Sequence, residues 1–334
     1  MKCTKAGSSY TSGQQGSNSH KERSDLPFHP SLIKRYQLGK VLGNGGYGFV
    51  LSAVDRLTRQ RCAVKFIYRH KIPSTGWTHV PSSSSSSLLS HASTVPSRVP
   101  TEVYLLQHTQ HKNIIRMLDV YQDSYFYYLV METHGSDWRS QQQCDPSLIS
   151  RDLPFSHNDD GGAQDLFECL EQNHHFSEER AHHIFNQVLD AVLHLKENGF
   201  YHRDIKDENI LIDHDFNIKL IDFGSAISKT YQSSWLNQFH GTLSFASPEI
   251  LSGKLYQPEP AEVWSLGVLL YTLLYGQVPF STPFQVIHGH YHTPSIQSSK
   301  QCSSLLASLF CKNPYDRPSL EDIRHHPWIT SKKM

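Results

Sequence analysis

The chain has few cysteines, no excess of either charge and no signal-type apolar segment at its start. Its 6 cysteines among 334 residues show neither a Cys-x-x-Cys pair nor regular spacing, which fits a reducing compartment. The 31 basic and 31 acidic residues cancel, so the overall charge gives no reason to expect a nucleic-acid partner. We therefore expect a protein of the cytoplasm or the nucleus that binds no nucleic acid.

A stretch long and apolar enough to cross a membrane is also missing from the sequence. The most apolar one, residues 263–275, is too short for a bilayer span and contains Ser265, Gly267 and Thr272. It predicts a buried core helix, and no membrane partner is expected.

Composition divides the chain into ordered and polar parts. With 334 residues, 38% of them hydrophobic, the chain can bury a substantial core in two lobes. Residues 1–33 are rich in Ser, Gly, Gln and Lys and lack apolar periodicity, so they are expected to be disordered. Two polar inserts, at about 74–99 and 135–162, interrupt the ordered part, residues 34–330, and the first, which has six consecutive serines, is expected to be disordered.

One region concentrates polar side chains around two short apolar runs. Asp204 and Asn209 precede the run 210–212, and Asp222 follows the run 218–221. The two runs predict a β-hairpin, which would bring the groups before and after it to one edge. Hard oxygen ligands that converge in this way suit Mg²⁺ carried by a nucleotide.

A glycine-rich turn near the start of the ordered part gives a second signal. Strand-like runs flank residues 43–48, so a hairpin is predicted. The glycines alone are also compatible with a flexible turn or with the opening of a dinucleotide-binding βαβ unit. A dinucleotide unit needs a helix next, whereas a third strand-like run, 61–67, follows and places Lys65 among apolar residues. Glycines let backbone N–H groups approach a phosphate without obstruction.

Together these motifs resemble those of protein kinases. Residues 201–209 resemble the catalytic loop, 222–224 the magnesium-binding Asp-Phe-Gly motif, 43–48 the glycine-rich loop and Lys65 the strand lysine. The resemblance covers about 300 of the 334 residues. It implies an α+β, bilobal protein-kinase-like fold within 34–330: a small, mainly β N-lobe to about residue 132 and a larger, mainly α C-lobe beyond it.

The resemblance implies ATP and Mg²⁺ as cofactors and assigns roles in catalysis. Asp204 would orient the substrate hydroxyl and accept its proton, while Lys206 would neutralise charge on the transferred phosphoryl group. Asn209 and Asp222 would hold the metal. Thr242, in the activation segment, completes the implied catalytic set together with Lys65 and Glu102.

A nucleotide site is implied as well. Lys65 would hold the α- and β-phosphates and pair with Glu102, which lies in a predicted amphipathic helix, with a solvated surface glutamate as the alternative. Met131 would close the back of the adenine pocket, and backbone groups of Glu132 to His134 would bond the adenine. The other implied nucleotide-binding residues, some of which could be ordinary core, are Leu42, Gly43, Asn44, Gly45, Gly46, Tyr47, Gly48, Val50, Ala63 and Leu211.

Three positions depart from the family's pattern. Phe245 stands where tyrosine is usual, Ser247 where alanine is usual, and Glu262 where an aspartate braces the catalytic loop. Glutamate is one methylene longer, so the brace is expected to shift or break. Glu249 and Arg317 imply the family's buried salt bridge.

The activation segment lacks the usual phosphate acceptor. Residues 238–240 carry no hydroxyl, and no acid occurs from 225 to 242, so Arg203 must pair with backbone oxygens or with a phosphate nearby. The first is favoured, because apolar residues of the segment can dock it without a charge switch. The candidate phosphate acceptors are Thr230, Tyr231, Ser233 and Ser234.

Lys206 resembles the serine/threonine kinases, since tyrosine-specific kinases lack a lysine there. The chain looks most like the calmodulin-dependent group, in particular PAS-domain kinases and Pim kinases of a fungal-looking kind, although no PAS domain is expected in the short N-terminal segment. Asp165 and Glu208 occupy positions where such kinases keep acids that receive a substrate arginine. Alternatively, Asp165 caps its helix and Glu208 is solvated.

The sequence thus predicts a monomeric serine/threonine protein kinase that acts on protein substrates. A pseudokinase scaffold is the alternative, supported by the three departures and the two inserts, and opposed by the intact Lys65, Glu102, Asp204, Asn209 and Asp222. A small-molecule kinase of related fold is disfavoured by the full activation segment.

Overall fold

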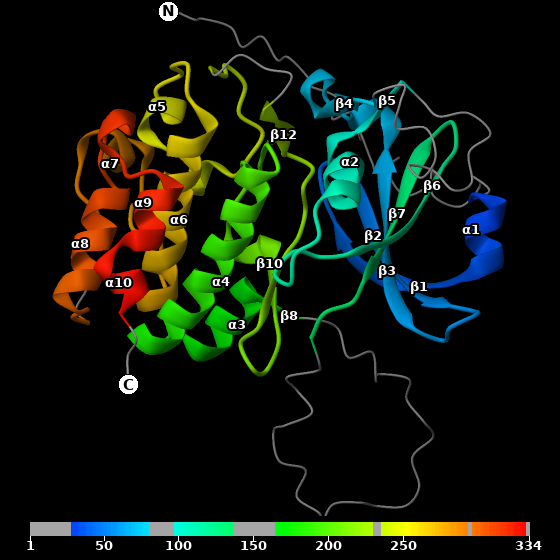
Figure 1. The fold of residues 1–334 in the computed structure, drawn as a ribbon, viewed down its shortest axis with the longest axis horizontal. Helices are drawn as coiled ribbons and strands as arrows, with labels where there is room; N and C mark the ends of the chain where they lie inside the picture. The colour runs from blue at the N-terminus through cyan, green and yellow to red at the C-terminus, as the bar shows by residue number, and fades with distance from the viewer. Residues whose placement is uncertain (1–27, 81–96, 136–163, 230–234, 293–295, 332–334) are drawn as a thin grey trace, which may run out of the picture.

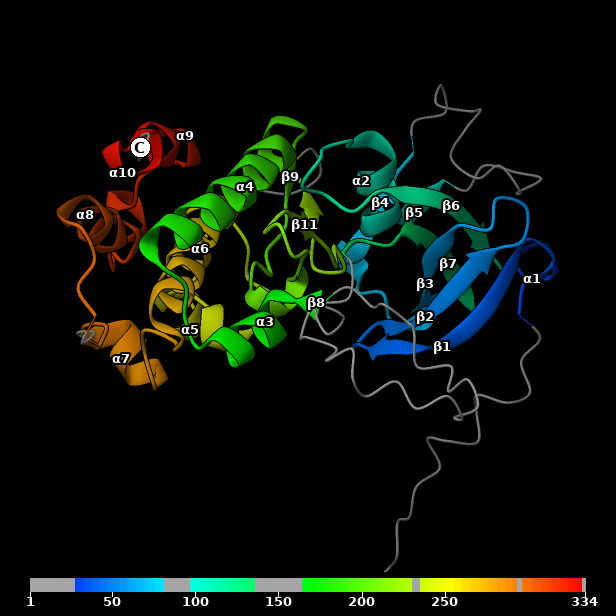
Figure 2. The ribbon, with the colours of Figure 1, turned by 90° about the horizontal axis from the view of Figure 1, so that it is seen from below.

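The computed structural model describes residues 28–80, 97–135, 164–229, 235–292 and 296–331, and it has two lobes side by side (Figure 1). Strands form most of the first lobe, and helices form most of the second (Figure 2). The predicted α+β, bilobal architecture is therefore confirmed. The polar insert at 135–162 lies, except for Gly135, outside the described residues.

A five-stranded antiparallel sheet in the order β1-β2-β3-β7-β6 forms the N-lobe. The glycine-rich turn joins β1 to β2, as the sequence predicts. Lys65 lies on the central strand β3, opposite Val50 on one side and Leu129 on the other. The strands are β1 (Tyr36–Asn44), β2 (Gly48–Asp55), β3 (Arg61–Tyr68), β6 (Met117–Gln122) and β7 (Phe126–Glu132).

Two segments of the N-lobe are ordered where the sequence predicts disorder. Pro30–Arg35 forms a short helix, α1, whose Leu32 is fully buried against the aromatic cluster of the sheet. Trp77–His79 (β4) pairs with Arg98–Pro100 (β5) in a small hairpin that leads directly into helix α2 (Thr101–His108). At these residues the two predictions were wrong, because the order comes from tertiary burial, which local composition does not show. The rest of both predicted disordered segments, residues 1–27 and 81–96, lies outside the described residues.

The C-lobe is built around two long helices, α4 (Glu178–Glu197) and α6 (Pro258–Tyr275). Ser177 caps α4 by accepting a hydrogen bond from the Arg180 N–H, as predicted, and α6 is the buried core helix that its apolar sequence indicates. None of the helices in the described ranges is long and apolar enough to span a bilayer. The other helices are α3 (Leu166–Asn173), α5 (Pro248–Leu251), α7 (Pro283–His288), α8 (Lys300–Leu309), α9 (Leu320–His325) and α10 (Pro327–Thr330).

Two small sheets lie at the junction between the lobes. The predicted hairpin is present: β10 (Ile210–Ile212) pairs antiparallel with β11 (Ile218–Leu220), and β8 (Gln164–Asp165) adds to its edge. A second pair, β9 (Phe200–Tyr201) and β12 (Ile227–Ser228), encloses the catalytic stretch in sequence. The loops that join these strands therefore lie on the side of the C-lobe that is next to the N-lobe (Figure 2).

Candidate active site

An ion-pair triad joins the two lobes. The Lys65 Nζ lies 2.6 Å from Glu102 Oε1 and 2.8 Å from Asp222 Oδ1, so one ammonium pairs with a carboxylate from each lobe. Only 11% of the Lys65 side chain is exposed, and 5% of Glu102. The predicted Lys65–Glu102 pair is present, and a solvated surface glutamate is ruled out.

The triad fixes the charges of its members. Burial alone would lower the pKa of Lys65, but the carboxylates of Asp222 and Glu102 outweigh it and raise the pKa. Lys65 in turn lowers the pKa of Asp222 to about 2. Asp222 is therefore ionised at neutral pH, which is the state that a metal ligand requires.

The catalytic loop brings Asp204 together with Asn209 and the activation segment. The Asn209 side-chain amide donates to the Asp204 carbonyl at 2.8 Å and to its Oδ2 at 3.0 Å, and the Thr242 N–H donates to Asp204 Oδ1 at 2.8 Å. Lys206 pairs with Glu208 on the same loop. The structure thus unites Asp204, Asn209 and Thr242 as the sequence predicts, while Thr242 contributes its backbone rather than its hydroxyl to this contact.

The glycine-rich turn closes over the Asp-Phe-Gly motif. A Cβ on Gly48 would lie 1.7 Å from the Phe66 carbonyl oxygen, so only glycine fits at this position, where β2 pairs with β3. A Cβ on Gly43, Gly45 or Gly46 would meet nothing within 4 Å, and the Gly45 N–H donates to the Gly48 carbonyl at 2.8 Å across the turn. Gly45 and Gly46 thus lie on the turn, while Gly43 and Gly48 lie at the strand ends that flank it. A Cβ on Gly224 would meet the Tyr47 ring at 3.0 Å, so the turn lies against the Asp-Phe-Gly motif.

The segment predicted to bind adenine follows β7. Ala63 and Met131 are paired across β3 and β7, and the side chains of Val50, Ala63, Met131 and Leu211 are partly exposed. One expectation needs correction: the Glu132 N–H donates to the Arg116 carbonyl at 3.0 Å, so it is not free for a ligand. The Glu132 carboxylate is also committed, to Lys219 at 2.8 Å. The carbonyl of Glu132 and the backbone of His134 remain for this role.

Glu262 braces the catalytic loop despite its extra methylene. Its Oε1 accepts the His202 N–H at 2.6 Å and the Arg203 N–H at 3.2 Å. The brace is therefore shifted onto one oxygen rather than broken, and Oε2 is buried without a hydrogen-bond partner. Burial raises the pKa of Glu262 to about 7, although the two backbone donors oppose this.

Arg203 anchors the activation segment through oxygens of the protein itself. Its guanidinium donates to the Gln238 carbonyl at 2.5 Å, to the Tyr256 hydroxyl at 2.7 Å and to the Ser225 carbonyl at 3.4 Å. The favoured prediction, pairing with backbone oxygens, is confirmed, while Tyr256 was missed because nothing in its local sequence marks it. The candidate phosphate acceptors from 230 to 234 lie outside the described residues.

The end of the activation segment is fixed by the predicted buried salt bridge. Arg317 donates to both Glu249 oxygens, at 2.8 and 2.7 Å, and its side chain is fully buried. Such bidentate pairs impose geometry as well as charge pairing. Phe245 and Ser247, the two departures nearby, are buried at 6% and 0% exposure, so both are accommodated in the core.

Acidic side chains cluster beside the catalytic loop. Asp165 caps α3 by accepting the Glu168 N–H at 2.8 Å, so the capping alternative is correct for this residue. Burial, with the nearby carboxylates of Glu168, Asp207 and Glu208, raises the pKa of Asp165 to about 6. Lys206 pairs with Glu208 and so balances only part of this cluster's negative charge, and the remainder favours a cationic ligand.

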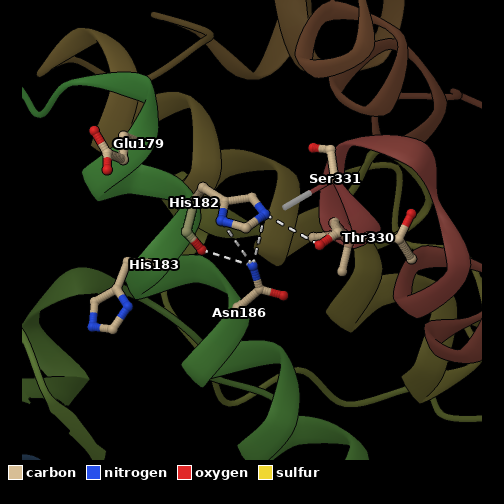
Figure 3. Close-up of a pocket in the computed structure, with 7 residues that line it drawn as sticks. Glu179, His182, His183, Asn186, Thr330 and Ser331 are labelled. Atoms are coloured by element: carbon tan, nitrogen blue, oxygen red, sulfur yellow. Dashed lines mark hydrogen bonds between the residues drawn. The ribbon is translucent and has the colours of Figure 1, made fainter. Parts of the chain in front are cut away.

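A separate concavity lies between α4 and α10, far along the C-lobe from the triad. Figure 3 shows its polar lining, in which His182 and Asn186 point toward one another. The Asn186 amide donates to the His182 carbonyl at 2.9 Å, and the His182 Nε2 lies 3.2 Å from the Ile329 carbonyl oxygen. These groups bond one another, so this concavity is not the candidate site.

Comparison with known proteins gives the class. A model of the protein kinase domain matches residues 36–144 and 154–329. The chain therefore belongs to the protein kinase family, which agrees with the geometry of the lysine, glutamate and aspartate triad.

Individual relatives narrow this to serine/threonine kinases. The chain is 34% identical to the PAS domain-containing serine/threonine-protein kinase of Mus musculus over 89% of its length, and 34% identical to serine/threonine-protein kinase pim-2 of Danio rerio over 90%. Serine/threonine-protein kinase PSK2 of Saccharomyces cerevisiae is 29% identical over 87%. The chain spans 18% of the mouse relative and 23% of the yeast one, but 86% of the zebrafish one. The predicted resemblance to PAS-domain and Pim kinases is confirmed, and the chain is a protein serine/threonine kinase.

Proposed function

We propose that this kinase transfers the γ-phosphoryl group of ATP, with Mg²⁺, to serine or threonine hydroxyls of protein substrates. Two observations carry the proposal together: the ion-pair triad of Lys65, Glu102 and Asp222, and the contact of Asn209 with Asp204 in the catalytic loop. Lys65 supplies a charge for phosphate oxygens, and Asp204 offers a carboxylate to a substrate hydroxyl. The three departures from the family's pattern leave these groups in place, which gives no support to a scaffold without activity.

The residues present fit a magnesium ion. Asp222 is an ionised carboxylate, and 45% of its side chain is exposed. The amide nitrogen of Asn209 is committed to Asp204, so its oxygen is the atom for a ligand role. Two hard oxygen donors, completed by phosphate oxygens and water, suit Mg²⁺. When bound, the ion would neutralise charge on the phosphates.

The direct test is transfer of labelled phosphate from ATP to a peptide library by the purified protein. We expect incorporation into serine and threonine peptides, dependence on Mg²⁺ and loss with EDTA. Absence of transfer under these conditions, from protein with an intact thermal transition, would reject the proposal.

We expect a preference for arginine three residues before the phosphorylated residue. Asp165 and Glu208 supply carboxylates near the catalytic loop, and a charge-assisted hydrogen bond to arginine is worth about 1.5–3 kcal/mol. Peptides with this arginine should therefore have kcat/KM at least about tenfold higher than alanine analogues, a difference of about 1.4 kcal/mol.

The same ratio should fall in Asp165→Asn and Glu208→Gln, since asparagine keeps the helix cap while it removes the charge. Glu171→Gln, an exposed acid on the same helix, is the matched control and should keep the ratio. Equal activity on both peptides would defeat the idea, whatever the variants do.

We also expect activity without phosphorylation of the activation segment. The Arg203 guanidinium already donates hydrogen bonds to oxygens of Gln238, Ser225 and Tyr256, so no phosphate is needed to hold it in place. Protein expressed in bacteria and treated with phosphatase, with dephosphorylation checked by mass spectrometry, should keep its kcat within about twofold. A loss of about tenfold would show that a phosphate is required.

For localisation, we propose a reducing compartment, the cytoplasm or the nucleus. Among the described residues, Cys62 and Cys169 are buried free thiols and Cys311 is a partly exposed one.

A further inference from the structure

Helix α2, which carries Glu102, has little to hold it in place by itself. It has only 8 residues, and Pro100 at its start provides no side-chain cap. Isolated helices of this length are marginal in water, because nucleation costs more than a few turns return. The position of Glu102, the second residue of the helix, must therefore be set by contacts with the rest of the lobe.

The hairpin β4–β5 makes these contacts at the first turn of α2. Both views place the two strands beside the helix (Figures 1 and 2), and β5 continues into it without a loop. The hydroxyls of Thr78 on β4 and Thr101 on α2 lie 2.9 Å apart, and each residue is 2% exposed. Thr101 directly precedes Glu102, so this buried hydrogen bond fixes the backbone that presents the glutamate.

The other face of the hairpin contacts the central sheet. The Trp77 ring meets the Tyr127 ring edge-on, with centroids 6.1 Å apart, and Tyr127 is fully buried on β7. Arg98 lies over the opposite strand's Trp77, 5.9 Å from the ring centroid. Strand β7 also pairs with β3, where Lys65 lies opposite Leu129. The hairpin thus connects the start of helix α2, which carries Glu102, to the same sheet that carries Lys65.

We propose that the β4–β5 hairpin positions Glu102 for nucleotide binding and that Thr78 is a positioning residue, which acts through its hydrogen bond to Thr101. The inference rests on the proposed use of ATP, and it assigns a role to a segment that the family's catalytic motifs do not include.

The test is a steady-state comparison of Thr78→Val with the unmodified protein. Valine keeps the shape but leaves the Thr101 hydroxyl buried and unpaired, and displacement of the start of helix α2 would relieve that cost. The KM for ATP should therefore rise severalfold and kcat/KM for ATP should fall about tenfold, while the KM for the peptide stays unchanged. Thr78→Ser, which keeps the hydroxyl, should retain the unmodified values.

A control variant separates positioning from loss of stability. Leu32→Ala removes a fully buried side chain from the opposite, aromatic cluster and should lower the midpoint of thermal unfolding. It lies away from Glu102, so the KM for ATP should not change. An equal rise of the ATP KM in Leu32→Ala, or no rise in folded Thr78→Val, overturns the proposal.

Two further outcomes remain decisive. If Thr78→Val does not fold, Trp77→Leu perturbs the same hairpin at its contact with Tyr127 and must raise the ATP KM, otherwise the proposal fails. If the unmodified protein transfers no phosphate from ATP, the proposed function fails instead, and the two failures are thereby distinguished.

Discussion

Replacement of Asp204 by asparagine is expected to lower kcat by about 10²- to 10⁴-fold, the usual contribution of a positioned general base. The carboxylate accepts hydrogen bonds from the amide of Asn209 and from the Thr242 N–H, at 3.0 and 2.8 Å, so it lies where the catalytic loop meets the activation segment. Asparagine keeps the size and one acceptor oxygen but cannot accept a proton at neutral pH. Binding of ATP should change little, because Asp204 does not contact Lys65 or Glu102.

The measurement is a steady-state assay with peptide and ATP, accompanied by a thermal melt. Asp215→Asn is the matched control, since it makes the same chemical change on the exposed turn of the β10–β11 hairpin, where 69% of the Asp215 side chain is exposed. It should leave kcat unchanged. Undiminished phosphorylation by folded Asp204→Asn protein would contradict the assigned role.

Lys65→Met is a weaker test of the same site. It would leave the Glu102 carboxylate buried with no cation, and loss of one partner from a buried pair costs about 3–5 kcal/mol. The fold is therefore expected to suffer together with catalysis, whereas Asp204→Asn separates the two.

The parts of the site that the sequence predicts are those that depend on local patterns. The apolar runs between Asp204 and Asp222 specify the hairpin β10–β11, and the glycines between two strand-like runs specify the turn that joins β1 to β2. The Lys65–Glu102 pair came from the family resemblance, because its members are 37 residues apart in the chain. No spacing rule connects them without the fold.

The misses share one physical cause. Helix α1 is held by burial of Leu32 under aromatic residues, and the hairpin β4–β5 by the contacts of Trp77 and Thr78, so their neighbours in sequence carry no sign of order. Tyr256 reaches Arg203 across 53 residues, and nothing near it distinguishes a structural hydroxyl from a surface one. Tertiary contacts of single side chains decided each case.

Glu262 shows how a departure from the family's pattern changes an energy without changing a contact. Its Oε1 accepts both hydrogen bonds that brace the loop, whereas its Oε2 is buried and has no hydrogen-bond partner among the described residues. Arg203, one of the residues it braces, has a left-handed backbone conformation with φ of 68°, which residues other than glycine adopt only at a cost in conformational free energy. The brace therefore restrains a strained part of the loop with a buried charge.

This arrangement predicts that stability falls as pH rises toward neutrality. Burial raises the pKa of Glu262 to about 7 in the folded protein, above its ordinary value of 4.5, so the folded state holds the proton more tightly than the unfolded state. The contribution is fully present below about pH 4.5 and is lost as pH rises through about 7. A difference of this size corresponds to about 3 kcal/mol of unfolding free energy.

The comparison that isolates this group is Glu262→Gln, because glutamine has the shape of the protonated acid and keeps an oxygen for the His202 and Arg203 N–H groups. Urea unfolding at pH 5 should give the variant and the unmodified protein similar free energies. At pH 8 the variant should be more stable by about 3 kcal/mol, since only the unmodified protein then buries a charge. Other titrating groups are common to both proteins and cancel in the difference. A difference that stays constant from pH 5 to pH 8 would show that Glu262 is already ionised in the folded protein at pH 5, and would contradict the raised pKa.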